Sequence, residues 1–503
     1  FVSNQNGPDS DPDSPLVVGS VNGSAANVGQ TIVLASGALL KVDADGTMSY
    51  DPNGAFNHLT TPDTGAVNIA AFDSFFYALA GGGTATVIVQ VHGLRTVDDR
   101  LEGNAFANVI TGNHFHDRFF LEQGGDDAAF GHGGNDGFFF GAALDHNDEV
   151  DGGADTDTVA IQGDYPNLVL GGITNVEVLL ALSGSDPQFG DVAGNLYDYD
   201  IATNDANVAA GMTLTVIGTG LLPGEDLVFD GSAETDGHFR VFAGQGDDDF
   251  TGGMGNDGFL FGADANLDGL DMVDGGAGID SIALRGNYVG PDAVVFGDMS
   301  FDNVEVIALL SGHSNEFGGL IDLNGFDYDL TLADGNVDAG QTLDVNAVGL
   351  QANESLILDA SLELDGSVRV LAGAGDDVLT GGQQADTLYG GLGADIIDGQ
   401  GGGDTYLYRA ANESAPGAAD SLAFGPGDVI HLAAIDADTN SAGDQAFAFI
   451  GAGAFTGTAG ELRAVDNGGG SWTVQADING DGAADMIITL NSTIPITANE
   501  FVL

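Results

Sequence analysis

Apolar residues recur with a nine-residue period between Ala372 and Leu407. Each unit has a glycine-rich half, then an Asp and, two places later, one apolar or aromatic residue. The Asp residues are Asp377, Asp386, Asp395 and Asp404, and the apolar residues are Leu379, Leu388, Ile397 and Tyr406. Glycine favours turns with positive φ, and the second half alternates as a very short strand does. The period therefore predicts a coil with two parallel stacks of short strands.

A period of two marks the segment from Leu16 to about Gly93. Its last predicted strand alternates at Val87, Val89 and Val91, and turn signals such as Asp45-Gly46 separate the earlier strands. This pattern predicts a small antiparallel β-sandwich at residues 16–95. The polar residues 1–15 before it are interpreted as a linker.

The nine-residue phase also appears in the middle of the chain, where the sequence is duplicated. NVEVLLALSG at 175–184 matches NVEVIALLSG at 303–312. We predict two copies, 96–242 and 243–371, each a short roll followed by a β-rich insert, and then a four-turn roll at 372–411. The repeat position is filled in the two copies by Asp117, Asp127, Asp136, Asp157, Asp248, Asp257 and Asp280. The two apolar segments are expected to form core strands; the alternative is that part of their surface contacts a neighbouring subunit.

Residues 412–503 alternate again and predict a C-terminal β-domain, so the expected fold class is all-β throughout. Within this domain, DINGDGAAD at 477–485 places side-chain oxygens at Asp477, Asn479, Asp481 and Asp485. The spacing resembles a D-x-N-x-D-G calcium loop, without the Glu at its twelfth position and the flanking helices. A type I turn between two strands is the alternative.

The charge of the chain indicates what the repeated Asp residues do. The sequence has 76 acidic and 9 basic residues, a formal net charge of −67. Asp side chains on successive strands lie roughly 5 Å apart, where two carboxylates repel by about 3 kcal/mol at an effective dielectric of 20. A hard cation removes this repulsion, and turn carbonyls supply its further oxygen ligands. We therefore predict multiple bound Ca²⁺ ions.

The same composition excludes several kinds of partner. A nucleic acid needs a basic surface, and an anionic membrane surface is disfavoured for the same reason. No apolar run reaches 18 residues, so membrane insertion is not expected. The absence of cysteine rules out disulfides and thiol-bound metals. With 43% hydrophobic residues, the chain is foldable and not a disordered acidic tail.

The repeats at Gly381–Asp386 and Gly390–Asp395 resemble the RTX nonapeptide GGxGxDxUx of secreted calcium-binding proteins. Residues 35–56 and 82–91 resemble the VCBS/cadherin-like modules of bacterial adhesins. The segment after the last roll resembles the C-terminal domain of serralysin-type proteins, and residues 491–503 resemble an uncleaved type I secretion signal. These resemblances imply type I export and an extracellular or cell-surface location. Whether Phe1 is a mature N-terminus or the chain is a fragment stays open.

No catalytic constellation is evident, so the chain is not expected to be an enzyme. H-E-x-x-H and G-x-S-x-G are both absent, and without Cys there is no thiol nucleophile. His114 and His116 lie beside Asp117 and could suggest a transition-metal cluster. They fall in phase with the repeats, however, and are interpreted as residues on a roll turn.

These observations favour a secreted, calcium-dependent structural protein of the bacterial cell surface. The first hypothesis is a self-assembling S-layer or filament subunit, whose main partner is a second copy of itself. The alternative is the distal segment of an adhesin, with a protein or a cell-surface polysaccharide as ligand. A secreted polysaccharide hydrolase remains a third alternative.

Overall fold

The computed structural model describes residues 16–94, 98–189, 194–262, 267, 269–314, 322 and 324–503. They form strands and short 3-10 helices, which confirms the all-β class. Within these residues, no helix has the length and apolar character needed to cross a membrane. The chain divides into two compact units, Phe1–Ile161 with Gly171–Val178, and Gln162–Leu170 with Leu179–Leu503. Each unit is described by itself.

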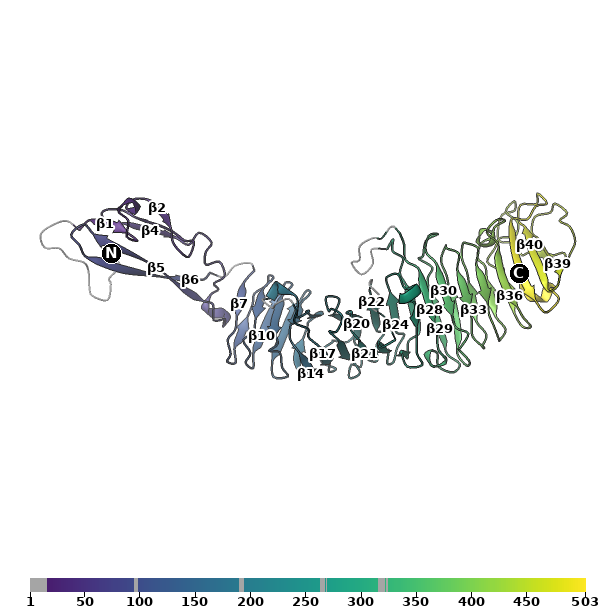
Figure 1. Cartoon of the computed structure of the whole chain (residues 1–503), viewed down its shortest axis with the longest axis horizontal. Coiled ribbons are helices and arrows are strands. Elements are labelled where there is room, and N and C mark those ends of the chain that lie inside the picture. The colour runs from purple at the N-terminus through teal and green to yellow at the C-terminus, as the bar shows by residue number, and fades with distance from the viewer. Residues whose placement is uncertain are drawn as a thin grey trace. The chain divides into compact units, whose positions relative to one another are not determined.

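The first unit begins with two antiparallel three-stranded sheets, ordered β1-β5-β6 and β2-β3-β4 (Figure 1). The strands are β1 (Val18–Val21), β2 (Thr31–Val33), β3 (Leu39–Val42), β4 (Met48–Asp51), β5 (Ala70–Leu79) and β6 (Thr84–His92). Val21, Leu40 and Phe75, which come from both sheets, belong to one buried cluster. The shared core makes the sheets two layers of a small sandwich, and the alternation along β6 leaves every second residue half-buried.

The rest of the first unit is a parallel coil, because successive strands alternate between two stacks. One stack contains β7 (Arg100–Glu102), β9 (Arg118–Phe120), β11 (Gly137–Gly141) and β13 (Thr158–Ile161). The other contains β8 (Val109–Thr111), β10 (Ala128–Gly133), β12 (Glu149–Ala154) and β15 (Gly172–Thr174). This is the two-stack arrangement that the nine-residue period predicts.

The second unit is likewise built of parallel strands that alternate between two stacks, in the residues of the predicted β-rich inserts that it contains and in the last roll (Figure 1). One stack comprises β16 (Val178–Ala181), β18 (Thr213–Ile217), β20 (His238–Phe242), β22 (Gly258–Phe261), β24 (Ser281–Leu284), β27 (Val306–Leu309), β29 (Thr342–Asn346), β31 (Ser367–Leu371), β33 (Thr387–Tyr389), β35 (Thr405–Leu407), β37 (Val429–His431) and β42 (Phe501–Val502). The inserts are therefore further turns of the coil, with longer connections than the nonapeptides have.

The opposite stack of the second unit is divided into two sheets. The first contains β14 (Tyr165–Val169), β17 (Tyr199–Ala202), β19 (Leu227–Asp230), β21 (Asp249–Thr251), β23 (Met272–Asp274) and β26 (Phe301–Asp302). The second contains β25 (Val294–Val295), β28 (Tyr328–Thr331), β30 (Leu356–Asp359), β32 (Val378–Thr380), β34 (Ile396–Asp398) and β36 (Asp420–Phe424), followed by β38 (Ala448–Phe449), β39 (Glu461–Gly468), β40 (Ser471–Asp477) and β41 (Met486–Ser492). Strands β39, β40 and β41 are antiparallel, while β36 pairs with β41 in parallel. The antiparallel strands thus end the regular coil.

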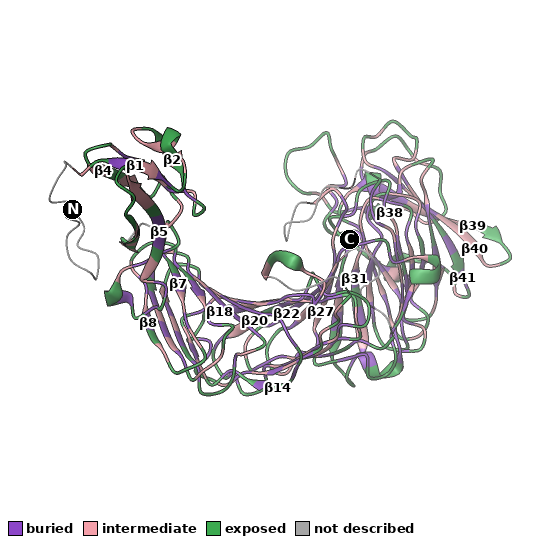
Figure 2. Cartoon of the chain, turned by 60° about the vertical axis from the view of Figure 1, so that its left-hand side comes forward, coloured by how far each residue is buried: buried purple, intermediate pink, exposed green. Residues whose placement is uncertain are grey.

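The interior of the coil is filled by one inward side chain per short strand, and buried positions alternate with more exposed ones along the strands (Figure 2). Aromatic rings of successive turns stack on one another. The ring centroids of Phe119 and Phe138, on adjacent strands of one stack, are 4.4 Å apart. Across the interior, the rings of Phe250 on β21 and Phe259 on β22, which belong to opposite stacks, are 5.8 Å apart. The inward apolar position of each repeat is therefore what packs one turn on the next.

Two buried glutamates hold the longer connections. Oε1 of Glu354 accepts from the backbone N–H groups of Gly312 and Phe326, and Oε2 accepts from the Ser311 hydroxyl and the Gln351 N–H. Glu225, its counterpart in the first copy, likewise accepts three backbone N–H groups. Both carboxylates satisfy turn N–H groups that no strand reaches.

Candidate metal centre

The repeat Asp residues of the last roll lie immediately before the short strands, with their side chains buried. Oδ1 of Asp395 accepts a hydrogen bond from the backbone N–H of Asp377 at 2.9 Å, one turn earlier in the same stack. Asp404 accepts from Asp386 in the other stack, also at 2.9 Å. Each carboxylate therefore links two turns of the coil, and we call such a series a carboxylate ladder.

The same ladders occur in both earlier copies. In the first unit, the N–H of Asp117 donates to Asp136, and the N–H of Asp136 donates to Asp157. In the second unit, the N–H of Asp257 donates to Asp280. Oδ1 of Asp127 accepts the backbone N–H of Asn108, and Oδ1 of Asp248 accepts the backbone N–H of Leu227. The structure thus places all eleven repeat Asp residues predicted from the period on ladders.

The second carboxylate oxygen is the unusual feature of the ladders. Oδ2 is buried without a hydrogen-bond partner in Asp136, Asp157, Asp280, Asp377, Asp395 and Asp404. An unpaired carboxylate oxygen inside a protein is costly, so it indicates a group that is missing from the protein alone.

Electrostatics supports the same conclusion. Burial, together with the neighbouring carboxylates of Asp420 and Asp377, raises the pKa of Asp395 to about 8. Burial likewise raises the pKa of Asp377 and of Asp404 to about 7. Such carboxyls are poorly stabilised as anions by the chain itself, and a nearby cation would favour the charged form.

Glycine shapes the space around these oxygens. A Cβ built on Gly390 would lie 2.1 Å from Oδ2 of Asp395, and one built on Gly399 would lie 2.1 Å from Oδ2 of Asp404. Any side chain at either position would therefore fill the space beside the unpaired oxygen. Only the repeat's glycine leaves room there, and the oxygen-rich turn suits a hard cation such as Ca²⁺.

Sequence reasoning missed several members of the ladders. They are Asp99, Asp148, Asp271, Asp420 and Asp428, together with Glu177 and Glu305 at ladder ends. Most of these Asp residues keep the Asp-x-apolar signature, as in Asp148-Glu149-Val150 and Asp428-Val429-Ile430. The signal was present. Asp99 stands in phase, 18 residues before Asp117, while the turns before the other four Asp residues are longer than the strict nine-residue period allows.

The predicted loop at 477–485 joins β40 and β41 and lies apart from the ladders. Both carboxylate oxygens of Asp477 accept backbone N–H groups, from Gly480 and Gly482. The Asn479 amide donates to Asp485, and Asp481 accepts the N–H of Ala483. In this arrangement the polar groups satisfy one another, as in a turn, and a calcium ion in this loop stays a prediction.

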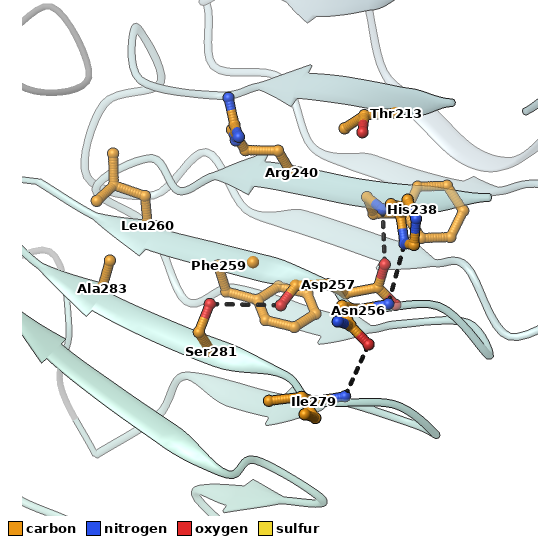
Figure 3. A pocket seen from close by; sticks show the side chains of 12 residues that line it. Thr213, His238, Arg240, Asn256, Asp257, Phe259, Leu260, Ile279, Ser281 and Ala283 are labelled. Atoms are coloured by element: carbon orange, nitrogen blue, oxygen red, sulfur yellow. Dashed lines mark hydrogen bonds between the residues drawn. The ribbon is translucent and has the colours of Figure 1, made fainter. Parts of the chain in front are cut away.

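A shallow pocket of about 350 Å³ lies over β20, β22 and β24 (Figure 3). His238 Nδ1 accepts the N–H of Asn256, and Oδ1 of Asn256 accepts the N–H of Ile279. These bonds tie together three successive turns beside the ladder residue Asp257. The polar groups here are used to hold the turns, so the pocket is secondary to the ladders as a candidate site.

The fold and ladders together define a parallel β-roll with buried acidic turns. Residues 96–122, 240–259 and 371–406 match the RTX calcium-binding nonapeptide repeat, in four copies. No curated protein matches the chain. RTX nonapeptide repeats bind multiple Ca²⁺ ions, and proteins that carry them are typically secreted by type I systems. Buried Oδ2 atoms without a hydrogen-bond partner lie in these repeats, and their assignment as ligands of those ions stays a prediction.

Proposed function

We propose that this chain is a calcium-dependent structural protein of the bacterial cell surface that self-assembles after it folds outside the cell. The observation that carries the proposal is the set of buried carboxylate oxygens without partners. With a net charge of −67, the compact calcium-free state is disfavoured by self-repulsion. Calcium binding then supplies folding free energy, so folding follows the step from low cytosolic calcium to the calcium-rich exterior.

Self-assembly is supported by an apolar row on the outer face of β30, β32 and β34. Ile357 is paired with Val378, and Val378 with Ile396, on adjacent strands. Ile357 is 40% exposed and Ile396 is 56% exposed. β-branched residues aligned on adjacent parallel strands suit contact with a second sheet, and a second copy of this chain is the partner that we propose.

The test is a calcium titration of chelated full-length protein, from zero to a few millimolar. Circular dichroism follows β-structure, and light scattering with negative-stain imaging follows assembly. We expect folding and then ordered sheets or fibres. A chain that folds but stays monomeric would favour the adhesin alternative instead, and a chain already folded in chelator would contradict calcium-dependent folding.

A paired variant separates assembly from folding. Ile357→Thr combined with Ile396→Thr keeps β-branched residues in the strands and removes most of the exposed apolar row. We expect the same calcium-induced folding with weaker assembly. Ile279→Thr, at a residue that is 61% exposed and lies outside this row, is the control. Equal assembly by the double variant and the control would contradict the proposed interface.

A further inference from the structure

Among the residues that the structure describes, two groups of three carboxylates lie outside the ladders, one in each copy of the duplicated sequence. The first comprises Asp205, Glu234 and Asp236, and the second comprises Asp334, Glu363 and Asp365. Each member of the second group follows its counterpart by 129 positions (334 − 205). Within each group, one carboxylate oxygen of every residue lies within 4.8 Å of the others. The same arrangement therefore forms in both copies of the duplicated sequence.

The Glu of each group is buried and has an oxygen without a partner. Glu234 and Glu363 are both 0% exposed. Oε1 of Glu363 accepts backbone N–H groups from Asp365 and Gly366, at 3.2 and 2.8 Å. Oε1 of Glu234 accepts the corresponding N–H groups of its own turn. Oε2 of both residues is buried without a hydrogen-bond partner, so this oxygen is available to a ligand.

The first Asp of each group comes from an earlier turn and is held in place by the backbone. Oδ1 of Asp205 accepts the N–H of Thr235 at 3.0 Å, and Oδ1 of Asp334 accepts the N–H of Leu364 at 2.9 Å. These bonds draw a carboxylate towards two others of the same charge. Three carboxylates at this separation repel one another when they are ionised. A bound cation would remove this repulsion and make the arrangement favourable in both copies.

The same turns lack a ladder carboxylate. Asp257 accepts the backbone N–H of Phe239, and Asp386 accepts the backbone N–H of Val368. In several other turns, the residue that donates this N–H is itself an Asp. None of the six triad residues lies in the segments that match the RTX nonapeptide. The triads are thus separate from the nonapeptide sites and stand in turns where the ladder is interrupted.

We propose that each triad binds one Ca²⁺ ion, which links two turns of the coil at a point where the nonapeptide ladder has no Asp. The donors are three carboxylates, and both Asp side chains are exposed, so water can complete the coordination. Such an ion would make the stability of the long connections between the rolls depend on calcium.

The test counts the ions bound to the full-length chain. Asp236→Asn combined with Asp365→Asn changes one exposed residue of each triad and leaves both Glu residues and their hydrogen bonds intact. At the lowest Ca²⁺ concentration that saturates the wild type, where a weakened site stays largely empty, equilibrium dialysis followed by elemental analysis should find two fewer ions per chain than in the wild type. Each single variant should lose one ion.

Asp338→Asn is the matched control, since this exposed Asp lies four residues after Asp334 and outside the triad. It should keep the wild-type ion count. A second pair, Glu234→Gln with Glu363→Gln, should lose the same two ions if the chain still shows the wild-type circular dichroism spectrum. An unchanged ion count in the folded Asp236→Asn, Asp365→Asn variant would overturn the proposal.

Discussion

The backbone N–H of Asp377 donates to Oδ1 of Asp395 at 2.9 Å, while Oδ2 of Asp395 is buried without a partner. One carboxylate thus performs two tasks. It links adjacent turns of the roll through one oxygen, and it offers the other oxygen to a cation. The two tasks can be separated by changing the charge without changing the shape.

Asp395→Asn is the variant that separates them. The amide oxygen can still accept the N–H of Asp377, but the negative charge is lost. We expect the calcium concentration at the folding midpoint of the last roll to rise several-fold, because a calcium ligand is weakened. Circular dichroism during calcium titration measures this midpoint. The control is Asp376→Asn, an exposed neighbour; a similar shift in both variants would argue against a specific role for Asp395.

The calcium-free chain should become less stable as the pH rises. Burial and neighbouring carboxylates raise the pKa of Asp395 to about 8, well above the value of about 3.9 in an unfolded chain. A carboxyl group whose pKa is higher in the folded chain than in the unfolded chain contributes fully to stability at a pH below the unfolded-state pKa. This contribution is lost as the pH rises through the folded-state pKa. Chelated protein should therefore show more β-structure at pH 5 than at pH 8.

The opposite trend is expected for calcium binding. Ca²⁺ binds the deprotonated carboxylates, so protons compete with it and the apparent affinity should fall from pH 8 to pH 5. Circular dichroism with and without chelator, at constant ionic strength, checks both trends. A chelated chain with more β-structure at pH 8 would contradict the assignment of the buried Asp residues as the groups that destabilise it.

The nine-residue period predicted the strand positions and the repeat Asp residues because one local unit fixes both the turn and the inward side chain. Asp148 and Asp271 were missed because the turns before them are longer, although Asp-x-apolar is retained. Glu225 and Glu354 could not be predicted, since they bind N–H groups that are distant in sequence. Such contacts depend on how turns of unequal length lie on one another, and local spacing does not contain this information.

Gly402 should tolerate a side chain less well than Gly417. Both have positive φ, 113° and 109°. A Cβ on Gly402 would lie 2.3 Å from the carbonyl oxygen of Gln384 in an earlier turn, whereas no heavy atom lies within 4 Å of a Cβ on Gly417. Gly417→Ala therefore costs only backbone strain, about 1–2 kcal/mol. Gly402→Ala should cost about 1–3 kcal/mol more, through the clash between turns.

Urea unfolding in saturating calcium compares these two glycine variants. Equal losses of unfolding free energy would mean that the turns can separate locally to admit a methyl group. Close contact between turns would then not be the reason for glycine at this position.

Glu354→Gln should destabilise the second unit whether or not calcium is saturating. Burial acts to raise the pKa of Glu354, but hydrogen bonds from Ser311, Gln351, Phe326 and Gly312 outweigh it, so the pKa lies below its usual value. The carboxylate is therefore charged, and its oxygens already have protein donors. The amide would present N–H groups to some of these donors and leave them unpaired, at an expected cost of about 3–5 kcal/mol. Urea unfolding measures this cost, with the exposed Glu122→Gln as control. Because no ion is involved, excess calcium should not restore the loss; restoration would mean that Glu354 is a calcium ligand and not a structural anchor of the turns.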